Sequence, residues 1–251
     1  MSAPNRTVAL ARPILRGGAF FDNRDLVLAL ASQLAICAPA LAGVWWAALR
    51  WHWSLFFCAV AFWVLMMLAA VVFLRILRQI WPLRPGRYCY APRDPTTYVW
   101  TLHSFVCATN LGIFYNHPSL LPSPAKKIFY RALGAQLGAG HMMIGGRLTD
   151  PYLITVESGA VVGGDCWLLA HAMARFETSV LILGPITIRR EAIIGAASLL
   201  MPGVTVEAGA VLRAMSYVPM NTTIPRDTEW GGNPAQPRER RRPMSSAAKD
   251  A

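Results

Sequence analysis

Two long stretches near the start of the chain carry no charged side chain. The first extends from Leu26 to Leu49 and the second from Trp53 to Leu74. Each exceeds the roughly 20 apolar residues that an α-helix needs to cross the hydrocarbon core of a bilayer. Because only three residues, 50–52, separate them, the two helices must be antiparallel neighbours. The pattern predicts a two-helix transmembrane hairpin over residues 26–81, preceded by an N-terminal arm over residues 1–25.

Arginines predict the orientation of this hairpin. Those that flank its outer ends are Arg6, Arg12, Arg16, Arg24, Arg75, Arg78, Arg84 and Arg87. Arg50 alone lies in the connecting turn. Positive residues favour the cytoplasmic side of a membrane. We therefore expect a multi-pass protein of the inner (cytoplasmic) membrane, with both termini and the catalytic domain in the cytoplasm.

The second half of the chain has a different pattern, an aliphatic residue at every sixth position. These residues are Ile182, Ile188, Ile194, Leu200, Val206, Leu212 and Val218, and upstream Val156, Val162 and Leu168. An α-helix would need a period near 3.6. A six-residue period suits a prism of short parallel strands, in which three faces make one coil and stacked coils bury the aliphatic column. The pattern predicts an all-β parallel β-helix over residues 136–224.

The six-residue register is interrupted once. Leu168 and Ile182 are fourteen residues apart, two more than a pair of hexads. A loop over residues 172–181 is therefore expected to leave the prism. His171 lies at the root of this loop, and histidine is the residue type most often used as a general base near neutral pH. Outside the prism, we expect interfacial helices and loops over residues 82–135. Residues 225–251 are expected to form a C-terminal segment with a basic tail.

Composition changes the picture in two respects. The formal net charge is +11, but the basic residues lie beside apolar segments and no nucleic-acid-binding motif is present. Membrane lipids are therefore the expected partner, and nucleic acid is not. The five cysteines include no CxxC pair, so they predict neither a disulfide framework nor a zinc site.

The six-residue period, followed by Gly231-Gly232-Asn233-Pro234-Ala235, resembles the hexapeptide-repeat acyltransferases. These are left-handed β-helices that move acyl groups from coenzyme A or a carrier protein. Over Pro85–Ala235 the runs PGRY, RALGAQLG, TDPYLITVESGAVV, LLAH and TEWGGNPA look like the C-terminal units of peptide synthetases of the polylysine-synthetase type. In those synthetases paired membrane helices alternate with acyltransferase-like domains.

The resemblance implies a membrane-anchored acyltransferase that transfers an acyl group from a thioester to an amine or hydroxyl. No permanently bound cofactor is expected, and the donor would be acyl-CoA or a carrier-protein thioester. His171 matches the position of the family's catalytic histidine. Its relatives carry acidic residues three and four positions later, where this chain has Ala174 and Arg175. Glu177 is the expected substitute, with Arg175 orienting the base or holding a substrate charge.

The resemblance also implies a donor-binding region. The expected residues are Ser198, Trp230, Gly232, Asn233 and Pro234. The basic run Arg238, Arg240, Arg241 and Arg242 could meet coenzyme A phosphates, although a membrane contact is favoured. A homotrimer is expected, since Val180, Leu181, Leu183 and Leu199 are predicted to face outward and would leave a large apolar surface on a monomer.

Three alternatives stay open. His141 competes with His171 as the base, although the start of the prism favours an end-cap role for it. A metal-dependent hydratase would need three converging histidines, and the repeat region offers only His141 and His171, so no metal is expected. The third alternative is a catalytically silent trimeric scaffold or subunit of a neighbouring synthetase or glycosyltransferase.

Overall fold

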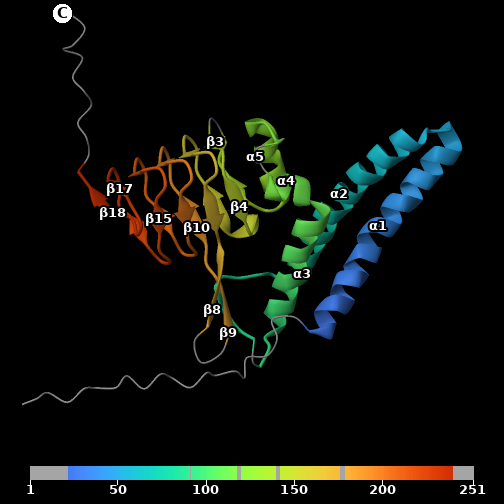
Figure 1. Cartoon of the computed structure of the whole chain (residues 1–251), viewed down its shortest axis with the longest axis horizontal. Helices are drawn as coiled ribbons and strands as arrows, with labels where there is room; N and C mark the ends of the chain where they lie inside the picture. The colour runs from blue at the N-terminus through green and yellow to red at the C-terminus, as the bar shows by residue number, and fades with distance from the viewer. Residues whose placement is uncertain (1–21, 91, 118–119, 140–141, 176–178, 240–251) are drawn as a thin grey trace, which may run out of the picture.

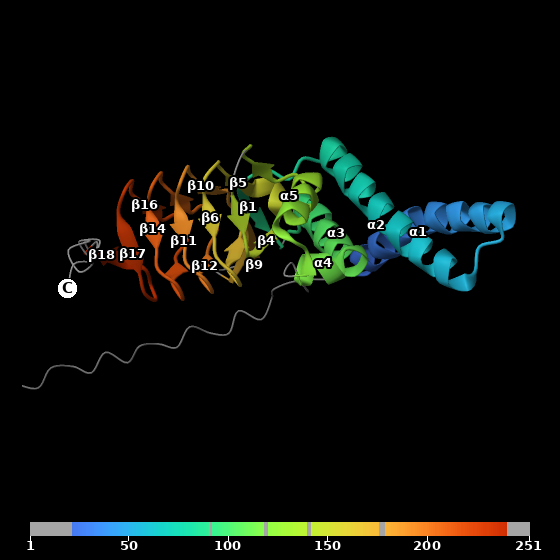
Figure 2. The same cartoon turned by 90° about the horizontal axis from the view of Figure 1, so that it is seen from above.

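The computed structural model describes residues 22–90, 92–117, 120–139, 142–175 and 179–239. A helical hairpin forms one end of the molecule and a β-helix the other, with shorter helices between them (Figure 1). Seen from above, the coils of the β-helix are stacked in a row that leads away from the hairpin (Figure 2). The predicted fold class, a helical hairpin joined to a left-handed parallel β-helix, is confirmed.

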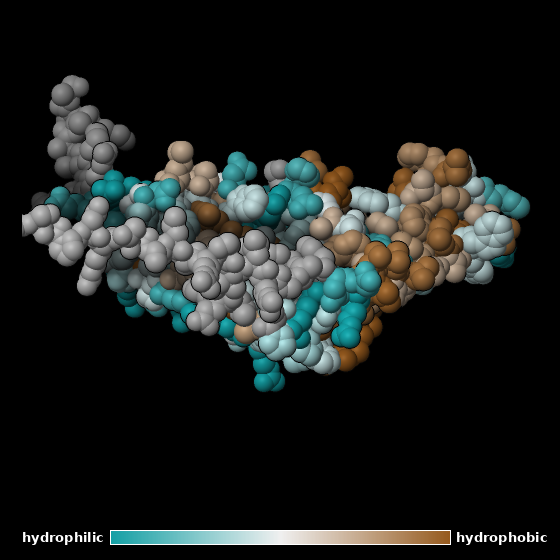
Figure 3. Space-filling view, turned by 60° about the horizontal axis from the view of Figure 1, so that its bottom comes forward, coloured by the Kyte–Doolittle hydropathy of each residue, from teal (hydrophilic) through white to brown (hydrophobic). Residues whose placement is uncertain are grey.

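The hairpin consists of α1 (Asn23–Trp51) and α2 (Leu55–Ile80), which are long and apolar enough to cross a membrane. Asp22 caps α1, because its side chain accepts hydrogen bonds from the backbone of Arg24 and Asp25. Small and aliphatic side chains form the buried seam between the helices. On the face that Figure 3 shows, hydrophobic residues gather over this end of the molecule.

Three helices connect the hairpin to the β-helix: α3 (Pro95–Asn110), α4 (Gly112–Asn116) and α5 (Ser123–Ala132). The first of them packs along both hairpin helices (Figure 1). Residues 82–135 thus contain the predicted helices and, in addition, the strand β1 (Gly86–Cys89). That these helices lie at the lipid headgroups stays a prediction.

The β-helix has three parallel sheets. One contains β2 (Gln136–Leu137), β5 (Ile154–Val156), β10 (Ile186–Ile188), β13 (Thr205–Val206) and β16 (Thr223–Ile224). The second contains β3 (Met143–Ile144), β6 (Val161–Val162), β11 (Ile193–Ile194), β14 (Val211–Leu212), β17 (Glu229–Gly231) and the antiparallel β18 (Gln236–Arg238). The third contains β4 (Arg147–Thr149), β7 (Trp167–Leu169), β12 (Leu199–Leu200) and β15 (Tyr217–Val218). A 3₁₀ turn, η2 (Pro151–Leu153), precedes β5.

The predicted aliphatic column fills the prism. Val156, Val162 and Leu168 are fully buried, and the column resumes at Ile188 and continues at every sixth residue to Val218. Strand register explains the stacking, since Leu168 lies beside Leu200 and Leu200 beside Val218. The prism extends beyond its predicted end at residue 224, because β17 adds a strand to the second sheet.

The prediction for the interruption needs correction. The chain leaves the prism as a β-hairpin, β8 (His171–Arg175) and β9 (Ser179–Leu183), which pairs with β1 in a separate antiparallel sheet. Ile182 belongs to this hairpin, where it lies beside Ala172, and is not part of the prism column. The alternation of the hairpin strand happens to place an aliphatic residue at the hexad position.

The expected outward apolar face is also wrong for most of its residues. Leu181 and Leu183 are 0% and 2% exposed and Val180 is 8% exposed, because β9 is the middle strand of the hairpin sheet. Only Leu199, in the third prism sheet, is partly exposed. The homotrimer stays a prediction, but these three buried residues do not support it.

Candidate active site

His171 lies where the chain leaves the prism. Leu168 points into the core, Ala170 is buried, and His171 begins β8. The backbone N–H of Gly184 donates to the carbonyl of Ala170 at 2.9 Å, which closes the base of the hairpin. His171 is thereby fixed at a prism edge, as the register interruption predicts.

Asp150 faces His171 from the preceding coil. Because Thr149 of β4 lies beside Leu169 of β7, the residues that follow the two strands also come together. The carboxylate Oδ2 of Asp150 contacts Nδ1 of His171. Asp150 is 2% exposed and adopts a left-handed backbone conformation, with φ of 53°. Aspartate tolerates this conformation better than most side chains.

Two further side chains hold the Asp150 carboxylate. Trp100 Nε1 donates to Oδ1 at 3.0 Å, and the Tyr152 hydroxyl donates to the same oxygen at 3.3 Å. Burial raises the pKa of Asp150, but the hydrogen bonds and charge of His171, with His103 and Trp100, hold that pKa below its ordinary value. Asp150 is therefore an anion that is fixed in place.

This arrangement leaves one ring nitrogen of His171 for chemistry. A carboxylate at Nδ1 favours the tautomer with a proton on that atom and orients the ring, so that Nε2 carries the free lone pair. The side chain of His171 is 26% exposed, whereas that of Asp150 is buried. The pair can therefore accept a proton from a group that approaches from solvent.

The helices form one wall of the site. The Trp100 ring, from α3, lies 4.9 Å from the His171 ring in an edge-to-face arrangement. One turn further along α3, the His103 ring stacks in the same manner on Tyr152. His103 is 1% exposed, and burial lowers its pKa to about 4. It is therefore a neutral packing residue at pH 7.

The structure does not describe the side chains of the other predicted catalytic and substrate-binding residues. Glu177 and His141 lie outside the described residues, as do Arg240, Arg241 and Arg242. Arg175 is described only as the backbone end of β8. The roles of Glu177 and Arg175 stay predictions.

Ser198 does not fit its predicted role in donor binding. It is 1% exposed, its hydroxyl donates to the carbonyl of Arg213 at 3.1 Å, and it accepts from the backbone of Ser216 at 3.2 Å. The Ser216 hydroxyl in turn accepts from the backbone N–H of Gly232. These serines form hydrogen bonds between successive coils at one corner. Because Ser198 is buried in this role, we remove it from the donor site.

The remaining predicted donor residues gather at the far end of the prism. Trp230 is half-buried beside Leu212, and Gly232, Asn233 and Pro234 follow it in a turn. Along the axis this turn is three strand spacings, about 14 Å, from the coil that carries His171. Figure 2 shows β17 and β18 at the end opposite the hairpin. The two predicted regions are therefore separate within one chain.

Sequence reasoning missed Asp150. The repeat length could have placed it only approximately, because a coil of three hexads would put residue 150 beside residue 168, whereas the observed register puts it beside residue 170. The irregular first coil hides this offset, because Ile144 and Leu148 are only four residues apart. Within the described residues, no group of three or more His, Cys, Asp or Glu side chains could hold a metal ion.

The fold and site together define a left-handed β-helix with a histidine–aspartate pair at the end that adjoins the α-helices. No protein-family model matches the chain. Among solved structures, a galactoside acetyltransferase in complex with coenzyme A aligns with 52% of this chain and 76% of its own, at 18% identity and a TM-score of 0.40. A hexapeptide-repeat acetyltransferase of Vibrio cholerae with acetyl-CoA aligns with 52% of this chain and 88% of its own, at 18% identity and a TM-score of 0.39.

Sequence comparison finds two curated relatives. The chain is 28% identical over 109 residues to a delta-poly-L-ornithine synthetase of Acinetobacter baumannii, a stretch that covers 43% of this chain and 8% of that protein. It is 44% identical over 50 residues to the mitochondrial gamma carbonic anhydrase 2 of Arabidopsis thaliana, 20% of this chain and 18% of that one. The chain thus matches less than a fifth of either relative. It is similar to hexapeptide-repeat proteins and to a segment of a poly-amino-acid synthetase, as its motifs indicate.

Proposed function

We propose that this protein is a membrane-anchored acyltransferase, in which His171 is the general base and a thioester is the donor. The observation that carries the proposal is the contact between Nδ1 of His171 and the buried carboxylate of Asp150. A histidine that merely caps a coil needs no fixed anion behind it. A base does, because the anion orients the ring and stabilises the imidazolium that forms.

The chemistry follows from this pair. Nε2 of His171 takes the proton from an acceptor hydroxyl or amine as that group attacks the thioester carbonyl. The tetrahedral intermediate then collapses, the carbon–sulfur bond breaks, and the imidazolium returns the proton to the leaving thiolate. His171 is the catalytic residue, and Asp150 is a positioning residue that acts through it.

The donor is acyl-CoA or a carrier-protein thioester, and its arm would lie along the prism edge. The turn that contains Gly232, Asn233 and Pro234 would hold one end of this arm, and His171 would meet the reactive end. Trp230 is half-buried beside this turn and would contact the arm. This placement is supported by the motif that ends the last coil and by the axial position of the pair.

The hairpin would anchor the enzyme, with the β-helix in the cytoplasm. Its supports are the length and apolar character of α1 and α2 and the arginines at their outer ends. Aromatic side chains at the opposite end of the hairpin also support its insertion in a membrane. Trp46 and Trp51 meet edge to face at 5.2 Å, and Trp51 stacks on Trp53 at 5.9 Å, as in a membrane-interface belt.

The rival proposal of a silent scaffold rested on the loss of acidic residues after His171. Asp150 supplies an acidic partner from another coil, so that loss no longer argues against activity. We therefore favour the enzyme.

The test uses the purified full chain in lipid nanodiscs. Acetyl-CoA and longer acyl-CoA donors are combined with sugar, amino-acid and lipid acceptors, and the acylated product and free thiol are measured by mass spectrometry. We expect one donor–acceptor pair to react, and His171→Ala to lower its rate about a hundredfold or more. His117→Ala is the matched control, because His117 is exposed at the end of α4. Equal activity of wild type and His171→Ala would contradict the proposal.

A further inference from the structure

A cavity of about 470 Å³ lies between the starts of α1 and α3. Its walls are mainly apolar and include Leu26, Ala29, Phe105 and Ala108, whereas Asp22 and Tyr98 lie at one end. We call this cavity the α1–α3 groove. Its volume falls within the range of sites that enclose a small ligand.

Two contacts fix how the groove is oriented. The Tyr98 hydroxyl donates to Asp22 at 2.7 Å, and Gln33 and Asn110 exchange hydrogen bonds of 2.9 and 3.1 Å. The helices α1 and α3 therefore run side by side in the same direction. From Asp22 to Gln33 α1 rises about 16 Å. In a chain anchored by the hairpin, the groove thus extends from the cytoplasmic surface into the bilayer.

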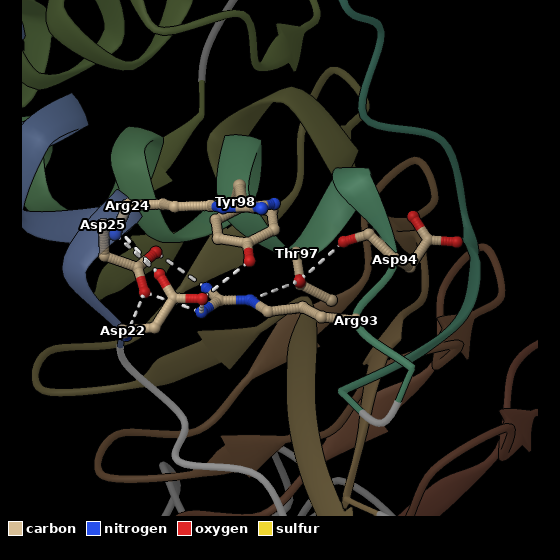
Figure 4. Close-up of polar contacts among 7 residues, drawn as sticks. All are labelled: Asp22, Arg24, Asp25, Arg93, Asp94, Thr97 and Tyr98. Atoms are coloured by element: carbon tan, nitrogen blue, oxygen red, sulfur yellow. Dashed lines mark hydrogen bonds and ion pairs between the residues drawn. The ribbon is translucent and has the colours of Figure 1, made fainter.

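At the polar end of the groove, Asp25 belongs to a fixed ion pair (Figure 4). Asp25 is buried and accepts two hydrogen bonds from Arg93, at 2.6 and 2.7 Å. The Arg93 guanidinium lies 3.7 Å from the centre of the Tyr98 ring. Because these charges satisfy one another, the groove needs no ionic ligand, and the surface that it offers beyond them is apolar.

The groove and the candidate active site share one wall. Trp100 lines the groove, donates to Asp150 and lies against the His171 ring. Along α3 it follows Tyr98 by half a turn, so it is at the polar, cytoplasmic end. An occupant that extends its chain toward Ala108 would therefore place its other end at the level of Trp100, the residue whose ring contacts His171.

We propose that the α1–α3 groove binds one hydrocarbon chain of a membrane lipid and that this lipid is the acyl acceptor. The inference rests on the proposed function and narrows it. A lipid reaches the groove from the bilayer without leaving an apolar environment, and its head group then lies at the level of Trp100 and His171. A water-soluble acceptor has no group to fill an apolar channel that leads away from the base.

The groove is tested by photolabelling of the full chain in phosphatidylcholine nanodiscs. The probe is a phosphatidylethanolamine with a diazirine in one acyl chain, and labelled peptides are located by mass spectrometry. We expect labels on residues 26–29 of α1 and 101–108 of α3. Labels spread evenly over the outer faces of α1 and α2 would contradict the proposal. So would labelling of the groove by a diazirine-bearing palmitoyl-CoA in place of the lipid.

Groove-filling variants provide the comparison. A tryptophan side chain would occupy the space of the hydrocarbon chain, so Ala29→Trp and Ala108→Trp should each lower groove labelling about tenfold or more. Ala59→Trp is the matched control, because Ala59 is exposed on α2 and does not line the groove. Unchanged labelling in both groove variants would overturn the proposal.

A fourth variant separates this inference from the proposed function. His171→Ala leaves the α1–α3 groove intact, so it should keep wild-type labelling while it loses acyl transfer. Loss of groove labelling in His171→Ala would contradict a binding site that is independent of the base.

Discussion

Asp150 connects the two halves of the molecule through side chains from three elements. It accepts from Trp100 of α3 and from Tyr152 of η2, and it contacts His171 of β8. The site is therefore built at the junction of the helices and the prism, although its base belongs to the β-helix. A carboxylate with this many partners orients the histidine more rigidly than an acidic residue in a surface loop would.

His103, beside this network, gives a stability prediction with a defined sign. Its pKa is about 4 in the native chain against an ordinary value of 6.5. Between pH 6.5 and pH 4 the histidine is therefore protonated in the unfolded chain but neutral in the native chain. The free energy of unfolding should keep its full value above pH 6.5 and should fall by about 3 kcal/mol as the pH drops toward 4.

The measurement is chemical denaturation in mild detergent at pH 7.5 and pH 4.5. In His103→Phe the ring can still stack on Tyr152, and no partner is lost at Nε2, which has none among the described residues. The variant should lose less stability than wild type on acidification, by most of those 3 kcal/mol. An equal loss in both proteins would contradict a buried neutral histidine.

Among the elements, the corners of the prism require close approach of the backbone. A Cβ at Gly195 would lie 2.2 Å from the backbone nitrogen of Ala214 in the next coil, whereas a Cβ at Gly164 would meet nothing within 4 Å. Gly195→Ala should therefore destabilise the protein by about 1–3 kcal/mol, and Gly164→Ala should be nearly neutral. Thermal unfolding of the two variants makes the comparison. Equal melting temperatures would show that the coil spacing is looser than described.

The sequence reveals those features of the fold that repeat. Val156, Leu200 and Val218 follow a fixed period because each coil has the same three faces, and the hairpin follows from apolar runs of membrane length. Ile182 misleads because a β-hairpin also alternates its side chains. Asp150 cannot be predicted from the sequence because its contact depends on the stacking of two coils that differ in length. The interruption of the register predicts that His171 lies at the prism edge, but it does not predict which residue contacts it.

For the whole molecule, two faces of the prism differ in what they present outward. The first sheet carries Thr155, Thr187, Thr205 and Thr223 at the positions that alternate with the core residues. The second carries Met143, Val161, Ile193 and Val211. Met143 and Ile193 are 47% and 43% exposed. An apolar column of this kind is a better basis for the predicted trimer than the hairpin residues were.

The trimer prediction can now be tested on that column. Ile193→Asp places a charge on the apolar second sheet and should shift the protein from trimer to monomer. Thr205→Asp, on the polar first sheet, is the matched control and should leave the assembly unchanged. Native mass spectrometry in mild detergent reads the oligomeric state. A wild-type monomer, or a trimer indifferent to Ile193→Asp, would contradict the prediction.

The orientation in the membrane is a separate prediction. In a chain whose native cysteines are replaced, Arg50→Cys and Ala251→Cys each add one thiol for a membrane-impermeant reagent. Only Arg50→Cys should be labelled from outside intact cells, because arginines at the outer ends of the hairpin favour the cytoplasmic side of the membrane. Labelling of Ala251→Cys alone would reverse the topology and place the site away from cytosolic thioesters.

The central claim is that Asp150 acts through His171 in thioester chemistry. A double-mutant cycle of Asp150→Asn and His171→Ala, read by free-thiol release from the active donor, tests it most directly. Asparagine tolerates the left-handed conformation at this position. We predict that Asp150→Asn lowers turnover about a hundredfold in the wild type and lowers it no further when His171 is already alanine. The same loss in both backgrounds, or none in either, would contradict the account.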